Sequence, residues 1–253
     1  MAKTSDHIVL VTGAGAGIGA ATARRYASEG ARVIAADYQA GRLDDVRKGF
    51  EANMRGLVLD LRNSDAVFSA IEGLPDDFKE ISILVNNAGV GPGTEPAHEA
   101  SLSDWEAIVD TNIKGVLYCI RAILPGMVER KRGHIVNISS TSATNNYKGG
   151  NVYGGSKAFV RQLSLNLRCD LLGTPVRVSS IEPGMTETRF TEVRYRGDSD
   201  KTAAHYDGLV PLSGDDLADV IFYTTMLPAH VNINTLQVTP ISMAPAGYAM
   251  HRE

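Results

Sequence analysis

The chain has 253 residues, of which 43% are hydrophobic, and its formal net charge is -4. A chain of this length can bury one sizeable core, because α/β folds routinely use about 250 residues as a single domain. The slightly acidic balance and the lack of a long basic run exclude a surface built to follow nucleic-acid phosphates.

The first residues contain only a short apolar run, at 8–11, whereas a secretory signal or a membrane span needs a longer one. We therefore expect a soluble, cytoplasmic protein that does not bind membranes. The two cysteines, Cys119 and Cys169, stand in apolar helical stretches and are expected to be buried thiols without a function. The six histidines show no metal-ligand spacing, so no metal site is predicted.

Short apolar runs rich in Val and Ile alternate with longer segments of helical period, a pattern typical of a parallel sheet with helices on both faces. Strands are expected at residues 7–11, 32–36, 56–59, 81–85, 134–138, 176–181 and 235–238. Helices are expected at 17–28, 41–52, 64–76, 103–127, 153–171 and 214–226. Ser103 and Glu106 have the spacing of a capping box, which predicts that the fourth helix begins there. The predicted fold is one α/β domain, residues 1–253, with a Rossmann-type doubly wound parallel sheet of about seven strands.

A glycine-rich turn follows the first expected strand and opens the first helix. It reads Val-Thr-Gly-Ala-Gly-Ala-Gly-Ile-Gly over residues 11–19. In this context glycines allow the backbone to approach a pyrophosphate at the helix N-terminus, although they also serve close helix–strand packing. The residues of this turn predicted to contact a dinucleotide are Gly13, Ala16, Gly17, Ile18 and Gly19.

Asp37 ends the second expected strand, where a carboxylate can accept hydrogen bonds from the adenosine ribose. A carboxylate at this place repels the 2′-phosphate of NADP, and the turn carries Ala14 and Ala16 rather than a basic residue. The sequence therefore predicts NAD as the preferred cofactor and NADP as the less favoured one. Two observations leave this open: Asp37 could merely cap the following helix, and the basic residue Arg42 lies further along.

Two more strands end in polar or small residues. Asp60 and Leu61 follow the third strand, and Asn87, Ala88 and Gly89 follow the fourth. Ligands of open α/β sheets bind at the carboxyl ends of the strands, so all five are candidate cofactor contacts. A plain turn is the alternative for the asparagine-containing segment.

Tyr153-Gly-Gly-Ser-Lys157 stands at the start of an expected helix, so the phenol and the ammonium share one helix face. A free phenol titrates near pH ~10, and a nearby ammonium lowers that pKa toward the range useful for acid–base chemistry. Ser140, thirteen positions before Tyr153, ends the fifth strand and brings a hydroxyl to the same sheet edge. A solvated helix face is the alternative for the Tyr-Lys pair alone.

These motifs, in this order, resemble the short-chain dehydrogenase/reductase family over essentially the whole chain. The matching segments are the Thr-Gly-x-x-x-Gly-x-Gly turn at 12–19, Asn-Asn-Ala-Gly at 86–89, Asn112, Ser140, Tyr153, Lys157 and Pro183-Gly184. The resemblance implies that this is an enzyme that moves a hydride between a nicotinamide cofactor and a hydroxyl or carbonyl carbon.

The resemblance also implies roles for individual residues. Tyr153 would exchange a proton with the substrate oxygen, and Ser140 would polarise and position that oxygen. Lys157 would lower the phenol pKa and hold the nicotinamide ribose, and Asn112 would support a water that links Lys157 to solvent. Further cofactor contacts are implied for Pro183, Gly184, Thr186 and Thr188, the last of these to the carboxamide.

Several longer stretches are similar to the bacterial 3-hydroxy acid dehydrogenases, also described as L-allo-threonine dehydrogenases or malonic semialdehyde reductases, and to the related sulfoacetaldehyde reductases. They include Leu124-Pro-Gly-Met-Val-Glu-Arg, Leu227-Pro-Ala-His-Val-Asn-Ile-Asn-Thr and the ending His251-Arg. That branch is generally tetrameric, which implies a homotetramer with the long helices at its interface. It also usually carries basic residues after the second strand for NADP, where this chain has Ala36-Asp37-Tyr38.

The segment 185–212 is charged, bears aromatic residues and fits neither repeating pattern, so we interpret it as a mobile lid. Its stretch Val193-Arg-Tyr-Arg-Gly-Asp resembles the lid of the hydroxy acid branch, in which an arginine meets the acid group. This resemblance makes Arg194 and Arg196 candidates to bind an acidic group of the substrate, together with Ser140 and Tyr153 at the reacting oxygen. The predicted substrate is a small acid such as a 3-hydroxy acid. A sulfonated aldehyde, a small polar polyol and a non-catalytic NAD-binding protein remain as alternatives.

Overall fold

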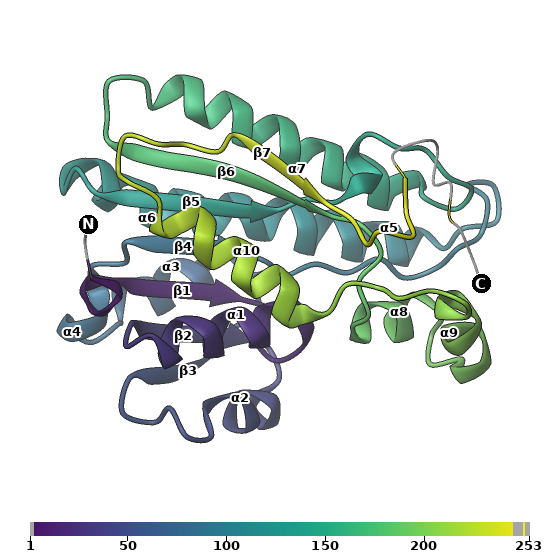
Figure 1. Ribbon diagram of the computed structural model, residues 1–253, viewed down its shortest axis with the longest axis horizontal. Coiled ribbons are helices and arrows are strands. Elements are labelled where there is room, and N and C mark those ends of the chain that lie inside the picture. The colour runs from purple at the N-terminus through teal and green to yellow at the C-terminus, as the bar shows by residue number, and fades with distance from the viewer. Residues whose placement is uncertain (1–2, 245–249, 251–253) are drawn as a thin grey trace.

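The computed structural model describes residues 3–244 and residue 250, so the His251-Arg ending lies outside the described residues. Seven parallel strands form one sheet in the order β3-β2-β1-β4-β5-β6-β7, with helices on both faces (Figure 1). One apolar layer packs α1, α2 and α10 on the sheet, and the other packs α3, α6 and α7 on the opposite face. The predicted doubly wound α/β fold is confirmed.

The strands lie close to their predicted positions. Their bounds are Ile8–Thr12 (β1), Arg32–Asp37 (β2), Met54–Val58 (β3), Ile83–Asn86 (β4), Gly133–Ile138 (β5), Val176–Pro183 (β6) and Thr235–Val238 (β7). The helices are Gly17–Ser28 (α1), Ala40–Arg47 (α2), Ser64–Glu72 (α3), Asp76–Lys79 (α4), Leu102–Ile108 (α5), Val116–Glu129 (α6), Asn151–Asp170 (α7), Arg189–Arg194 (α8), Ser199–Tyr206 (α9) and Gly214–Met226 (α10).

The helix expected at 103–127 differs from the prediction in its start and in its middle. It begins at Leu102 after Ser101, and the hydroxyls of Ser101 and Ser103 bond to each other at 2.8 Å, so the predicted capping box with Glu106 does not define its start. A π-helical turn, Val109–Gly115, separates α5 from α6. Such turns insert an extra residue into a helix and occur often at functional sites. Here the turn carries Asn112.

The order of the strands places a crevice at the carboxyl ends of the neighbouring strands β1 and β4. The chain runs outward from β1 to β2 and β3, and then returns to pair β4 with β1 on the other side. Loops that leave the carboxyl ends of β1 and β4 therefore diverge, and ligands of doubly wound folds bind in the crevice between them. The segment 185–212 lies beyond the same ends of the strands (Figure 1).

The segment 185–212 is more regular than its sequence pattern indicates. It contains the short helices α8 and α9, and its two ends meet in a parallel bridge between Thr186 and Leu212. Backbone bonds between Met185 and Leu212 and between Glu187 and Leu212 tie these ends together. It therefore forms a closed excursion over the carboxyl ends of the strands.

The two cysteines differ in environment, which corrects the expectation that both are buried. Cys119 is buried in α6, and burial raises the pKa of its thiol to about 12. Cys169 lies near the end of α7 and is exposed. None of the helices in the described part of the chain combines the length and the apolar character that crossing a membrane requires.

Candidate active site

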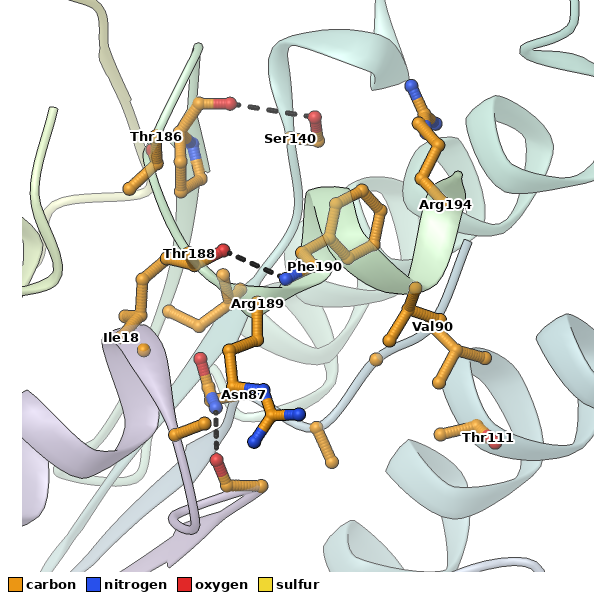
Figure 2. Close-up of a pocket in the computed structure, with 18 of the residues that line it drawn as sticks. Ile18, Asn87, Val90, Thr111, Ser140, Thr186, Thr188, Arg189, Phe190 and Arg194 are labelled. Carbon is orange, nitrogen blue, oxygen red and sulfur yellow. Dashed lines mark hydrogen bonds between the residues drawn. The ribbon is translucent and has the colours of Figure 1, made fainter. Parts of the chain in front are cut away.

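A cavity of about 610 Å³ opens at the carboxyl ends of the strands. This volume is in the range of cofactor and small-molecule sites, which are clefts of ~300–1,000 Å³. In Figure 2, Ile18, Thr188 and Asn87 lie on one side, and Val90, Thr111 and Arg194 lie on the other. Both sides contain residues that the sequence assigned to a site.

The glycine-rich turn at the start of α1 has the geometry of a phosphate cradle. Gly13 and Gly17 have φ values of 64° and 52°, which L side chains rarely adopt. A Cβ on Gly19 would lie 2.2 Å from the carbonyl oxygen of Gly13, so only glycine fits there. Gly13, Ala16, Gly17 and Ile18 line the cavity, whereas Gly19 supports the turn from behind. The free N–H groups at a helix N-terminus suit a pyrophosphate, so these residues fit a dinucleotide.

The Asn-Asn-Ala-Gly segment after β4 braces this turn. Asn87 donates from Nδ2 to the carbonyl oxygens of Thr12 and Gly13, at 2.9 and 3.2 Å. The hydroxyl of Thr12 in turn accepts the backbone N–H groups of Asn87 and Ala88. Asn86 points elsewhere, to Asn137 on β5. The segment is thus more than a plain turn, and its Asn87, Ala88 and Gly89 line the cavity as predicted.

Asp37 lies at the end of β2 and is 8% exposed. Each of its carboxylate oxygens accepts a backbone N–H group, Oδ2 from Gly15 and Oδ1 from Gln39, both at 3.0 Å. The carboxylate therefore fixes the glycine-rich turn against the following loop. Arg42 lines the cavity beside it, and a Cβ on Gly15 would lie 3.0 Å from the Cβ of Arg42.

Asp60 and Leu61 line the next part of the wall, after β3. The carboxylate of Asp60 pairs with the guanidinium of Arg62 through two nitrogens, at 2.9 and 2.7 Å. This pairing lowers the pKa of Asp60. The charge of Arg62 at the cavity rim is therefore neutralised locally.

The two adjacent serines after β5 have different partners. Ser139 donates to the backbone carbonyl of Lys157 at 2.8 Å and so fastens the strand to α7. Ser140 lines the cavity, caps the 3-10 turn that follows, and lies 3.5 Å from the carbonyl oxygen of Pro183 (Figure 2). Both serines line the cavity, but the hydroxyl of Ser139 is engaged by the carbonyl of Lys157.

Tyr153 and Lys157 lie one helical turn apart on α7, and both line the cavity. The ammonium of Lys157 is 5.9 Å from the centre of the Tyr153 ring and donates to the carbonyl of Ile138 at 2.8 Å. Burial lowers the pKa of Lys157 from 10.5 to about 8, because the charged form loses its hydration. The sequence-predicted serine, tyrosine and lysine are thus brought together.

Asn112 is buried behind this group and does not line the cavity. Its Oδ1 accepts the N–H of Val90 at 2.8 Å, and its Nδ2 donates to the carbonyl of Val90 and to the hydroxyl of Ser156, at 2.9 and 3.0 Å. A Cβ on Gly89 would lie 3.3 Å from both Asn112 Oδ1 and Lys157 Nζ. The side chain thus joins the π-helical turn, the loop after β4 and α7.

The residues at the end of β6 and just after it complete the predicted cofactor set, because Pro183, Gly184, Thr186 and Thr188 all line the cavity. Thr188 caps α8 by accepting the N–H of Phe190 at 3.3 Å, and its side chain lies against Gly17, whose Cβ would be 3.0 Å from that of Thr188 (Figure 2). The start of the segment 185–212 therefore meets the glycine-rich turn across the cavity.

The two arginines predicted to bind substrate have different places. Arg194 lines the cavity, and its guanidinium carbon lies 5.1 Å from the centre of the Tyr153 ring. Arg196 does not line it: its guanidinium pairs with Asp104 at 2.7 Å and with Glu95 at 3.6 Å. The assignment of Arg196 to the substrate therefore does not agree with its position, because these carboxylates hold it at the outside of the molecule.

Several residues that line the cavity were not predicted. They come from loops, from the π-helical turn, from α8 and from the last described residues, and include Val90, Thr111, Tyr147, Phe190, Met243 and Met250. The ring of Phe190 lies 5.2 Å from that of Tyr153, and a Cβ on Gly91 would press on both. The only sequence signal for Phe190 is its place two residues after Thr188, and none marks Tyr147.

Comparison with known proteins identifies the family. The family model for short chain dehydrogenases matches residues 7–198. The NADP-dependent 3-hydroxy acid dehydrogenase of Escherichia coli K12 is 49% identical over 247 residues, which cover 97% of this chain and all of that protein. Serine 3-dehydrogenase of Agrobacterium fabrum is 46% identical over 245 residues, 97% of this chain and 98% of that one.

The fold agrees with that of a solved relative. The closed form of a serine dehydrogenase complexed with NADP+ superimposes with a TM-score of 0.93 at 49% identity, covering 97% of this chain and 99% of the other. The resemblance to the hydroxy acid dehydrogenase branch predicted from short motifs is therefore confirmed.

The predicted preference for NAD is wrong by the same comparisons, because one close relative is NADP-dependent and another is bound to NADP+. The prediction treated Asp37 as a carboxylate free to face the cofactor. In the structure two backbone N–H groups occupy it, and Arg42 supplies a positive charge beside it. A carboxylate at the end of β2 is thus an insufficient sign of NAD preference.

The chain carries the family's glycine-rich turn and its serine, tyrosine and lysine around one cavity, and close relatives match it over 97% of its length. It therefore belongs to the short-chain dehydrogenase family and is an oxidoreductase that acts on a CH-OH group.

Proposed function

We propose that the enzyme transfers a hydride between NADP(H) and the hydroxyl-bearing carbon of a small 3-hydroxy acid. The observation that carries the substrate class is the guanidinium of Arg194, which faces the cavity and forms no ion pair within residues 3–244 or with residue 250. Its Nε is buried and has no hydrogen-bond partner there. A buried charge is stabilised by an opposite charge, so an acid group on the substrate suits this site.

The reacting end is proposed to work through Ser140, Tyr153 and Lys157. Ser140 holds the substrate oxygen by a hydrogen bond, and Tyr153 exchanges a proton with that oxygen. The ammonium of Lys157 favours the phenolate form of Tyr153 and binds the nicotinamide ribose. Asn112 holds the loop after β4 in a fixed position relative to α7, which carries Lys157. When bound, the nicotinamide supplies or accepts the hydride.

The cofactor is proposed to lie along the predicted residues from Gly13 to Thr188, with its 2′-phosphate near Arg42. Arg42→Ala is expected to raise KM for NADP about 10–100-fold and to change KM for NAD much less, because a hydrogen-bonded charge pair is lost. Arg62→Ala is the matched control, since Asp60 already neutralises that arginine. Steady-state kinetics with both cofactors tests this. Equal loss with NAD and NADP would contradict the placement.

The substrate class is tested with 3-hydroxypropionate and 1,3-propanediol, which share a carbon skeleton but differ in the acid group. Arg194→Ala is expected to raise KM for the acid about 10–100-fold, the scale of a hydrogen bond to a charged group, and to leave cofactor affinity unchanged. Arg196→Ala is the control, because its guanidinium pairs with Asp104 and Glu95. An enzyme that uses the diol as well as the acid would refute the proposal.

We propose further that the whole chain works as one domain, with the segment 185–212 as a lid that shields the hydride path from water. We also propose a homotetramer. In its support, α6 and α7 leave an open apolar groove that is lined by Leu117, Ile120, Leu124, Val128, Leu163 and Leu167.

A further inference from the structure

Tyr147 lies in the loop before α7, and its hydroxyl is 2.7 Å from Nη2 of Arg194. This is the only hydrogen bond that the guanidinium of Arg194 makes to a side chain in the part of the chain that the structure describes. The guanidinium also lies 5.4 Å from the centre of the Tyr147 ring. One nitrogen of the guanidinium is therefore held by Tyr147, while the buried Nε has no partner.

Three aromatic rings surround the same guanidinium. Its central carbon lies 5.4, 5.1 and 5.3 Å from the ring centres of Tyr147, Tyr153 and Phe190. Phe190 and Arg194 come from α8, whereas Tyr147 and Tyr153 come from the loop before α7 and from α7 itself. The rings restrict where the cation lies, but ring faces do not select its rotation in its own plane. A directional hydrogen bond does, and Tyr147 supplies it.

The backbone around Tyr147 is itself fixed. Gly150 donates its N–H to the carbonyl of Tyr147 at 3.1 Å, and a Cβ on Gly150 would lie 2.7 Å from the Tyr147 ring. Gly149 has a φ of 79°, and its Cβ would lie 2.3 Å from the carbonyl oxygen of Thr94. The turn thus needs both glycines, and it presses the ring of Tyr147 into one position.

We propose that Tyr147 is a positioning residue for acid recognition: it holds Nη2 of Arg194, so that the remaining donors of the fork face the acid group of the substrate. This rests on the proposed function, in which Arg194 binds that group. A fork that is oriented before the substrate arrives loses less rotamer freedom on binding, and it presents two parallel donors to a carboxylate or a sulfonate. Tyr147 therefore acts on substrate affinity through Arg194.

Tyr147→Phe tests this, because it removes the hydroxyl and keeps the ring. KM for 3-hydroxypropionate is expected to rise about 10-fold, the loss of one hydrogen bond to a charged group, with kcat within about twofold. The kcat/KM for 1,3-propanediol should stay within about twofold. In an Arg194→Ala background the same change should have no further effect on the acid, because the two residues act as one unit.

Tyr206→Phe is the matched control. Its hydroxyl bonds to Thr191 and to the carbonyl of Thr186 within the segment 185–212, so its loss should affect the acid and the diol alike. The inference would be overturned if Tyr147→Phe left KM for the acid unchanged, or if it lowered kcat/KM for the acid and the diol equally. It would also be overturned if the effect on the acid persisted in the Arg194→Ala background. An unmodified enzyme that uses acid and diol equally would overturn the proposed substrate class itself, and the role of Tyr147 with it.

Discussion

Tyr153 has an aromatic neighbour and two cations around its ring. Phe190 packs at 5.2 Å, Lys157 Nζ lies 5.9 Å from the ring centre, and the guanidinium of Arg194 lies 5.1 Å from it. A positive charge beside a phenol favours the phenolate, so this position suits a proton-exchanging group. Because packing against Phe190 holds the ring, replacing Tyr153 by Phe removes the hydroxyl and leaves the ring in place.

Tyr153→Phe is expected to lower kcat by at least ~100-fold, the usual contribution of a general acid–base group, and to leave cofactor affinity nearly unchanged. Measuring NADPH affinity by fluorescence titration and kcat on the same variant separates the two effects.

Tyr26→Phe is the control for this variant, because that hydroxyl is buried against Thr225 and Tyr26 does not line the cavity. Tyr26→Phe should lower the stability of the fold and leave kcat unchanged. Turnover close to that of the unmodified enzyme in Tyr153→Phe would remove Tyr153 from the mechanism.

At the scale of elements, the π-helical turn Val109–Gly115 lies where three parts of the chain meet. Asn112 connects these parts: two of its hydrogen bonds go to Val90 in the loop after β4, and one goes to Ser156 in α7. Asn112→Ala leaves the N–H and the carbonyl of Val90 without these partners, which should destabilise the fold by about 2–4 kcal/mol.

Urea denaturation of Asn112→Ala, with Asn145→Ala as the control, measures this. The side chain of Asn145 donates to one backbone carbonyl, that of Thr141, so Asn145→Ala should destabilise the fold much less. If the two variants lose equal stability, Asn112 does not join these elements.

The elements near the cofactor were predictable because their signals are local. A strand followed by Gly13, Gly17 and Gly19 needs no knowledge of the rest of the chain, since positive φ values and close backbone approach exclude other residues. The same holds for the spacing of Tyr153 and Lys157 on one helix face. These parts of the site could be placed before any coordinates were known.

Other parts depend on contacts between distant segments, which the spacing of residues does not reveal. Arg196 is one residue of a charged stretch until Asp104, 92 positions away, is placed beside it. A role for Tyr147 likewise becomes visible only when Arg194, 47 positions later, is placed beside it. Asp37 was taken as a sign of NAD preference because its bonds to Gly15 and Gln39 are not visible in the sequence.

At the scale of the whole molecule, the faces of α6 and α7 leave an apolar groove at the surface. Leu117 and Val128 on α6 are 37% and 36% exposed. An isolated chain tolerates charges at such positions, whereas an interface between subunits does not.

If the proposed tetramer forms through this groove, Leu117→Glu combined with Val128→Glu should lower the particle mass measured by light scattering toward that of smaller species. Val210→Glu, at a residue that is 78% exposed in the segment 185–212, is the control and should leave the mass unchanged. A double variant that keeps the full mass would place the subunit interface elsewhere.

The unequal environments of the two cysteines make the chain easy to label. Only Cys169 is exposed, while Cys119 is buried and the raised pKa of its thiol, about 12, keeps it protonated. A maleimide dye should therefore attach at one position without any engineered cysteine. Sixteen residues of α7 separate that position from Tyr153, or about 24 Å at ~1.5 Å per residue. Energy transfer between dyes on different subunits would report assembly without disturbing the chemistry.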